Sequence, residues 1–195
     1  MPKITNVEFL EFSANHHNAS RNWLVIKLNT DNPKLFGLGD ASAMEDEDEV
    51  KSIISSWTEK YLSGKDPLES EVLWTNLYHD PHARGGRLAT TSLSGIDIAL
   101  WDLKGKILKQ PVWRLLGGSF REKIRVYANG WYTNPGAPEL NAEEAKKVVD
   151  MGYTALKFDP FGQNNYYKIS LKELDIAEKR VESVRKSVGD NIDIL

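Results

Sequence analysis

The stretch TALKFDPFG, residues 154–162, carries two opposite charges in a segment that otherwise resembles a strand ending in a Pro/Gly turn. Side chains alternate along a strand, so Lys157 and Asp159 are expected on one side and Leu156 and Phe158 on the other. An unpaired buried charge is costly, so the charged side must open to water, pair internally or line a working site. The pair is therefore either a structural ion pair or a set of catalytic groups.

Composition narrows the class of protein. The 195 residues are 41% hydrophobic and carry a net charge of -3, which is typical of a globular protein that buries a core. The sequence shows neither a long apolar run nor a signal-peptide pattern, so we expect a cytoplasmic protein without a membrane partner. Without cysteine, disulfides and thiolate chemistry are excluded. The absence of a basic cluster argues against nucleic acid and favours a small-molecule ligand.

The first part of the chain predicts an antiparallel meander. Its strand-like segments are 3–12, 23–28 and 35–40, with turn formers between the last two. Residues 13–22, SANHHNASRN, form a polar stretch that we interpret as a ten-residue loop. A loop longer than a hairpin needs is either a functional loop or a merely solvated one.

Helical periodicity follows the meander. The patterns predict a helix from Glu47 that ends at Gly64, a helix through Tyr78 with Asp66 as its N-cap, and a core helix over 94–108. The acidic run at 45–49 precedes the first helix, where negative charge favours the helix dipole, and we prefer this explanation to a metal site.

Strands and helices alternate in the last part of the chain. The order is a strand at 124–131, a helix over 141–151, the strand TALKFD, a helix over 170–188 and the strand NIDIL. This alternation predicts parallel βα units. Capping boxes are expected at Asn141 with Glu144 and at Ser170 with Glu173.

The fold class is thus an α+β N-terminal domain followed by the first βα units of an incomplete (β/α) barrel. We place the boundary near residue 122, with the N-terminal domain at 1–122 and the start of the barrel at 123–195, truncated in the third strand. A closed eight-fold barrel takes roughly 250 residues, so this part is too short to close.

Three motifs in order, SLSGIDIALWDLKGKILKQPVWRLLGG, VYANGW and MGYTALKFDPFG, resemble the mandelate racemase and muconate-lactonizing branch of the enolase superfamily. The resemblance covers essentially the whole chain. It implies that residues 1–122 form a capping domain over the mouth of a barrel that begins at residue 123.

The resemblance also implies a chemistry. This family abstracts a proton α to a carboxylate while a divalent metal stabilises the enediolate. Many members carry Lys-x-Lys at the end of the second barrel strand. Here Lys157 matches the first lysine, whereas Asp159 replaces the second, so both are implied as catalytic and a two-base racemase is disfavoured. Lys-x-Asp before Pro-Phe-Gly looks more like a Mg²⁺-dependent dehydratase of aldonate or aldarate sugar acids, with a racemase, epimerase or cycloisomerase as alternatives.

Five further residues are implied near the substrate. Asn129 and Trp131 end the first barrel strand and, with Tyr127, are expected to share one face, either to bind substrate or to pack. His16, His17 and Arg21 lie in the stretch that corresponds to the family's specificity loop, where cations suit a polyhydroxy carboxylate. Solvated side chains are the alternative interpretation for these three residues.

The family's metal ligands are acidic residues ending the third, fourth and fifth barrel strands. Asp193 lies too early in its strand, so the resemblance assigns no metal residue to this chain, and the Mg²⁺ of the full-length enzyme is expected to be held outside it. We therefore expect the fragment alone to be inactive. Unpaired strand edges favour a homo-oligomer, association with the missing barrel half, or a non-catalytic association module.

Overall fold

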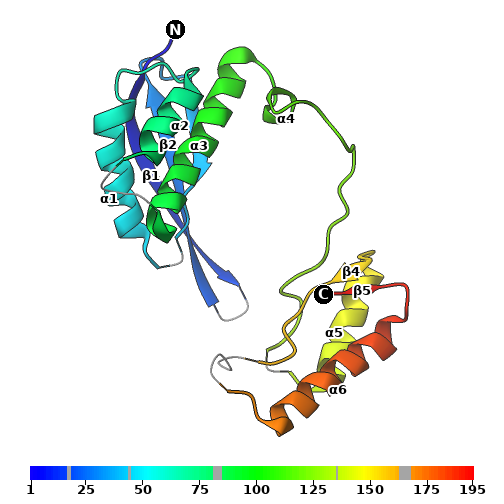
Figure 1. Cartoon of the computed structure of the whole chain (residues 1–195). Helices are drawn as coiled ribbons and strands as arrows, with labels where there is room; N and C mark the ends of the chain where they lie inside the picture. The colour runs from blue at the N-terminus through cyan, green and yellow to red at the C-terminus, as the bar shows by residue number, and fades with distance from the viewer. Residues whose placement is uncertain (17–18, 44, 81–84, 135, 163–167) are drawn as a thin grey trace. The chain divides into compact units, whose positions relative to one another are not determined.

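The computed structural model describes residues 1–16, 19–43, 45–80, 85–134, 136–162 and 168–195, with the backbone alone at 14–16 and 19–21 (Figure 1). The chain forms two compact units, Met1–Phe120 and Arg121–Leu195. None of the described helices has the length and apolar character needed to span a membrane.

The first unit contains the expected meander. Strands β1 (Ile4–His16), β2 (Ala19–Thr30) and β3 (Phe36–Asp40) form an antiparallel sheet in the order β1-β2-β3. Alternate residues of β2, namely Leu24, Ile26 and Leu28, are fully buried. Period-2 alternation thus gives the sheet one core face.

The ten-residue loop expected at 13–22 is wrong, because most of that stretch belongs to the two strands. Pairing of β1 with β2 continues from Ser13 opposite Asn22 to His16 opposite Ala19. Ser13 and Asn22 are both exposed, and the Ser13 hydroxyl lies 3.1 Å from Asn22 Oδ1. Residues 13–22 are polar in sequence and lack the apolar alternation that marks a half-buried strand, so pattern reading missed this extension.

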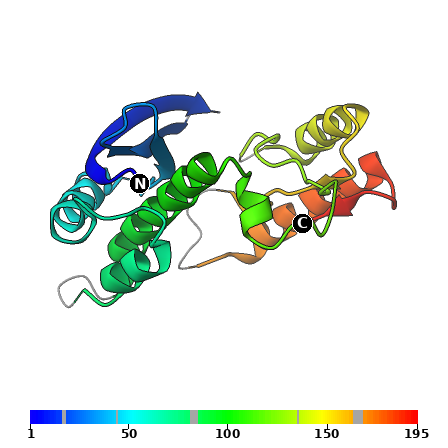
Figure 2. The ribbon, with the colours of Figure 1, turned by 90° about the horizontal axis from the view of Figure 1, so that it is seen from above.

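Helices cover the core face of the sheet. They are α1 (Glu47–Trp57), which continues as the π-helical η1 (Thr58–Leu62), then α2 (Ser70–Tyr78) and α3 (Gly86–Leu108). The short α4 (Val112–Leu115) follows α3 and buries none of its residues. Gly64, with φ 75°, follows the end of η1 as expected. The long α3 lies along the sheet in both views (Figures 1 and 2).

Two predicted helix starts are wrong. Asp66 does not cap α2; its Oδ1 accepts the Leu68 N–H at 2.9 Å and shapes a turn before the helix begins at Ser70. Helix α3 begins at Gly86 rather than near residue 94. Thr90 and Ser92 disfavour a helix by propensity, yet their hydroxyls donate to carbonyls one turn back, so the helix accommodates them.

Glycines let α3 approach β3 closely. A Cβ on Gly37 would lie 2.0 Å from the Ala99 carbonyl oxygen, and one on Gly39 would lie 2.0 Å from the Gly95 carbonyl oxygen. Polar side chains of α3 also cover the free edge of β3: Asp102 accepts the Leu38 N–H at 2.8 Å, and Lys106 donates to the Phe36 carbonyl at 2.8 Å. The edge strand is therefore satisfied within its own unit.

The second unit contains parallel βα units. Strands β4 (Ala155–Leu156) and β5 (Asp193–Ile194) pair in parallel, and Ala128 adds a parallel bridge to Leu156. Helices α5 (Pro138–Asp150) and α6 (Leu171–Val188) pack side by side (Figure 1). The expected strands are thus present in order, but each pairs over one or two residues.

Only one of the two capping boxes forms. Ser170 and Glu173 bond reciprocally at the start of α6, as predicted. Asn141 caps nothing, because α5 already begins at Pro138. Its buried side chain donates to the Thr133 carbonyl, and Glu144 accepts from the Thr133 N–H and hydroxyl. These two polar residues hold the segment before α5 instead.

We predict that Gly39→Ala lowers the free energy of unfolding by roughly 1–3 kcal/mol, because the new methyl group meets backbone of α3 that cannot move aside. Leu38→Ala is the matched control, since Leu38 is 37% exposed and points to the other face of the strand. Urea denaturation of the three proteins measures the difference. Equal losses in both variants would contradict the tight contact.

Candidate active site

Lys157 lies where three parallel segments meet. Its N–H donates to the Ala128 carbonyl at 2.8 Å, while on the other side the Leu195 N–H donates to the Leu156 carbonyl at 2.9 Å. Leu156 is fully buried and Phe158 is 7% exposed, both in the core shared with α5 and α6. The Lys157 side chain is exposed, so it projects to the opposite face, as alternation predicts.

Asn129 and Tyr127 share this face with Lys157. Because Ala128 pairs with Leu156 in parallel, the next residue, Asn129, comes alongside Lys157 at the carboxyl ends of the strands. Asn129 is exposed, and its Oδ1 accepts the Gly130 N–H at 3.0 Å. The Lys157 Nζ lies 5.7 Å from the centroid of the Tyr127 ring. The structure thus brings an ammonium, an amide and a phenol together.

Asp159 builds a turn. Its Oδ1 accepts the Phe161 N–H at 2.9 Å and so shapes the Pro160–Phe161 corner. Among the described residues, the side-chain contacts join Asp159 to the turn and Lys157 to the Tyr127 ring, rather than to each other. The interpretation of the two charges as a structural pair therefore loses its support, while their catalytic roles stay predictions.

Trp131 departs from the expected arrangement. Gly130 has φ 69°, which ends the extended backbone, so alternation from Tyr127 does not carry through to Trp131. The Trp131 ring packs against Phe158 at 5.5 Å and Tyr132 at 5.4 Å between centroids. Its Nε1 is buried and has no acceptor among the described residues. Packing, one of the two roles considered, is what the structure shows for this ring.

The three remaining predicted residues belong to the other unit. His16 lies at the end of β1 and Arg21 near the start of β2, opposite Ala14 in the ladder. His17 lies outside the described residues. His16 and Arg21 therefore belong to the paired strands of a hairpin rather than to a long loop. Contact of His16, His17 and Arg21 with substrate stays a prediction.

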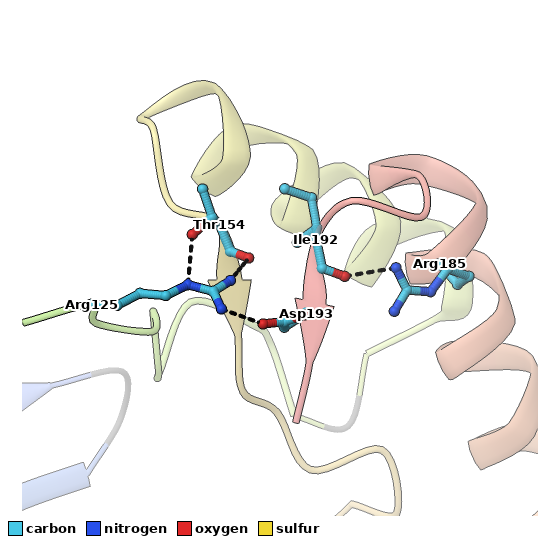
Figure 3. Close-up of polar contacts among 5 residues, drawn as sticks. All are labelled: Arg125, Thr154, Arg185, Ile192 and Asp193. Atoms are coloured by element: carbon cyan, nitrogen blue, oxygen red, sulfur yellow. Dashed lines mark hydrogen bonds and ion pairs between the residues drawn. The ribbon is translucent and has the colours of Figure 1, made fainter.

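Arg125, Thr154 and Asp193 form a polar clamp that joins the beginnings of the strands (Figure 3). It was not predicted from the sequence. Arg125 donates to the Thr154 hydroxyl at 3.0 Å and to the Thr154 carbonyl at 2.7 Å, and it pairs with Asp193 at 2.5 Å. Arg185 donates to the Ile192 carbonyl at 2.7 Å, which fixes the return from α6 into β5. One signal was available: Arg125 and Asp193 both occupy strand starts and carry opposite charges.

The described residues do not form a metal site by themselves. No group of three or more histidine, aspartate or glutamate side chains gathers within the described ranges. Asp193 pairs with Ala155 at the start of the parallel strands and is held there by Arg125 (Figure 3). No step of chemistry can be assigned to a metal from these residues.

Comparison with protein families identifies the first unit. Residues 11–117 match the model of the mandelate racemase / muconate lactonizing enzyme N-terminal domain. The chain belongs to this family. The capping-domain fold expected from the resemblance is thereby confirmed, and the barrel part is incomplete.

Relatives within the mandelate racemase family extend the match. The chain is 45% identical over 139 residues to D-gluconate dehydratase of Thermoproteus tenax, covering 71% of this chain and 28% of that protein. It is 33% identical over 183 residues to D-galactonate dehydratase of Xanthomonas euvesicatoria pv. vesicatoria, covering 91% and 45%. A solved enolase superfamily member from Salmonella Typhimurium matches with a TM-score of 0.87 and 30% identity, covering all of this chain and 54% of that one. The chain thus spans about half the length of this solved relative.

We predict that Arg125→Met destabilises the second unit by about 1 kcal/mol, because an exposed ion pair adds little but the bonds to Thr154 are also lost. Trp131 is the sole tryptophan in residues 121–195, so its ¹⁹F resonance in fluorotryptophan-labelled protein reports the unfolding of this unit. Lys123→Met, at a neighbouring exposed position, is the control. A loss as large in the control as in Arg125→Met would argue against the clamp.

Proposed function

We propose that this chain is the N-terminal part of a sugar-acid dehydratase that acts on aldonate- or aldarate-type substrates. The observation that carries the proposal is the exposed Lys157, fixed between two buried residues at the carboxyl end of a parallel strand. Active sites of (β/α) barrels lie at this end. Relatives named D-gluconate and D-galactonate dehydratase support the same reaction class.

The proposed reaction removes the proton α to the substrate carboxylate and expels the β-hydroxyl as water. A base outside this chain takes the proton, and the electron pair of the broken C–H bond forms the enediolate. The β-hydroxyl then leaves with a proton as water, which gives an enol that tautomerises to the 2-keto acid. The Lys157 ammonium stabilises the negative charge that develops on the carboxylate. Asn129 beside it offers an amide to the substrate hydroxyls.

Asp159 argues for elimination rather than two-base racemisation. A carboxylate does not replace a lysine that takes up and returns a proton on one face of the substrate, because its ordinary pKa is far lower. Asp159 also accepts a hydrogen bond from the Phe161 N–H, which stabilises the turn. Asp159 is proposed to shape the site through this turn.

A divalent cation completes the proposed site. Mg²⁺ would act as a Lewis acid that polarises the substrate carboxylate, and we propose that residues outside this chain hold it. His16, His17 and Arg21 are proposed to supply substrate contacts. The fragment is proposed to be inactive by itself, and the complete enzyme is proposed to be cytoplasmic.

Exposed apolar residues favour association of the second unit with further polypeptide. Ile124, Val126 and Leu171 are 79%, 61% and 86% exposed. On α6, Leu174 and Val181 are also exposed, whereas Ala177 and Val184 are buried. The remainder of a barrel, or a second copy of the protein, would cover such residues.

We predict that Lys157→Ala lowers the rate of α-proton exchange at least about 100-fold, because a preorganised charge at the oxyanion is lost. The measurement follows exchange of D-gluconate in D₂O by NMR, using a form of the protein that carries the remainder of the barrel. Lys146→Ala, on the exposed side of α5, is the control.

A rate of α-proton exchange in Lys157→Ala equal to that of the wild-type protein would contradict the role proposed for this lysine. The product separates the reaction classes, because dehydration yields a 2-keto-3-deoxy acid, whereas an epimerase returns a sugar acid of unchanged composition.

A further inference from the structure

Lys157 has a rigid backbone and a long, exposed side chain. Its backbone is held by strand pairing on both sides, and its two neighbours are buried. The side chain itself has four rotatable bonds and stands on the open face of the sheet, where burial does not restrict it. The direction of the ammonium must therefore be limited by groups on that same face.

Tyr127 is such a group. It comes from the neighbouring segment, before the Ala128 bridge, and its ring centroid lies 5.7 Å from the Lys157 Nζ. This distance is within the roughly 6 Å over which an aromatic ring attracts an ammonium. The ring is 48% exposed, so it borders the open face rather than forming part of the core.

We infer that Tyr127 is a positioning residue, whose ring holds the Lys157 ammonium at the carboxyl ends of the strands. The contact is an attraction between the ring face and the cation, so it depends on the aromatic ring and not on the hydroxyl. The catalytic meaning of this contact rests on the proposed function, whereas the contact itself does not. The two can therefore be tested separately.

The contact is tested by NMR on the 195-residue chain after reductive ¹³C-methylation of its lysines, which keeps their charge. The Lys157 resonance is assigned by its absence in Lys157→Arg. We expect it upfield, in the ring current of Tyr127, and expect the shift to vanish in Tyr127→Leu and to persist in Tyr127→Phe. Lys104, 4.9 Å from the Trp101 centroid, is an internal control whose resonance should not respond to either variant.

An unchanged Lys157 resonance in Tyr127→Leu would overturn the inference. A shift lost in both Tyr127→Leu and Tyr127→Phe would overturn it as well, because the ring would then not be the cause.

The consequence for turnover is measured in a form that carries the remainder of the barrel. Misplacing a catalytic group is costly, so Tyr127→Leu is expected to lower kcat on the order of tenfold, with little change in KM and with rescue by Tyr127→Phe. A methyl shift that behaves as expected, together with unchanged kcat, would uphold the contact and count against the role of Lys157 in the proposed reaction.

Discussion

The candidate site depends on the burial of the two residues that flank Lys157. Leu156 and Phe158 are anchored in the apolar layer beneath α5 and α6, so the backbone between them cannot turn over without exposing both. Because successive side chains in a strand point to opposite faces, burial of Leu156 and Phe158 directs the Lys157 side chain to the other face. The ammonium therefore reaches the open face as a result of hydrophobic packing rather than of any bond made by the lysine side chain.

The two ends of these strands are organised by different forces. At the start, Arg125 joins Thr154 and Asp193 through a planar, forked set of donors, which fixes the register of three segments (Figure 3). At the other end, the exposed side chains of Lys157 and Asn129 come from neighbouring segments. In (β/α) barrels, residues at the beginnings of the strands stabilise the fold, whereas residues at the carboxyl ends carry the active site.

The sequence predicted the kinds of element better than their limits. Periodicity identified the meander, the helices and the parallel units, because burial imposes those patterns directly. It failed elsewhere: residues 13–22 are polar and lack the apolar alternation that marks a strand, and Asp66 and Asn141 form local bonds other than the caps their positions suggested. In the site, alternation placed Lys157 correctly but could not foresee that Gly130 would turn Trp131 onto Phe158. Arg125 was missed because its partners lie 29 and 68 residues away along the chain.

The two units differ in how completely they satisfy their own surfaces. In the first, Asp102 and Lys106 bond the free edge of β3, and glycines let α3 lie directly on the strand. In the second, β4 and β5 pair over two residues, and large apolar side chains such as Ile124 and Leu171 stay exposed. Exposed apolar surface and unpaired strands both favour association, so the second unit is expected to gain stability when further polypeptide pairs with its sheet.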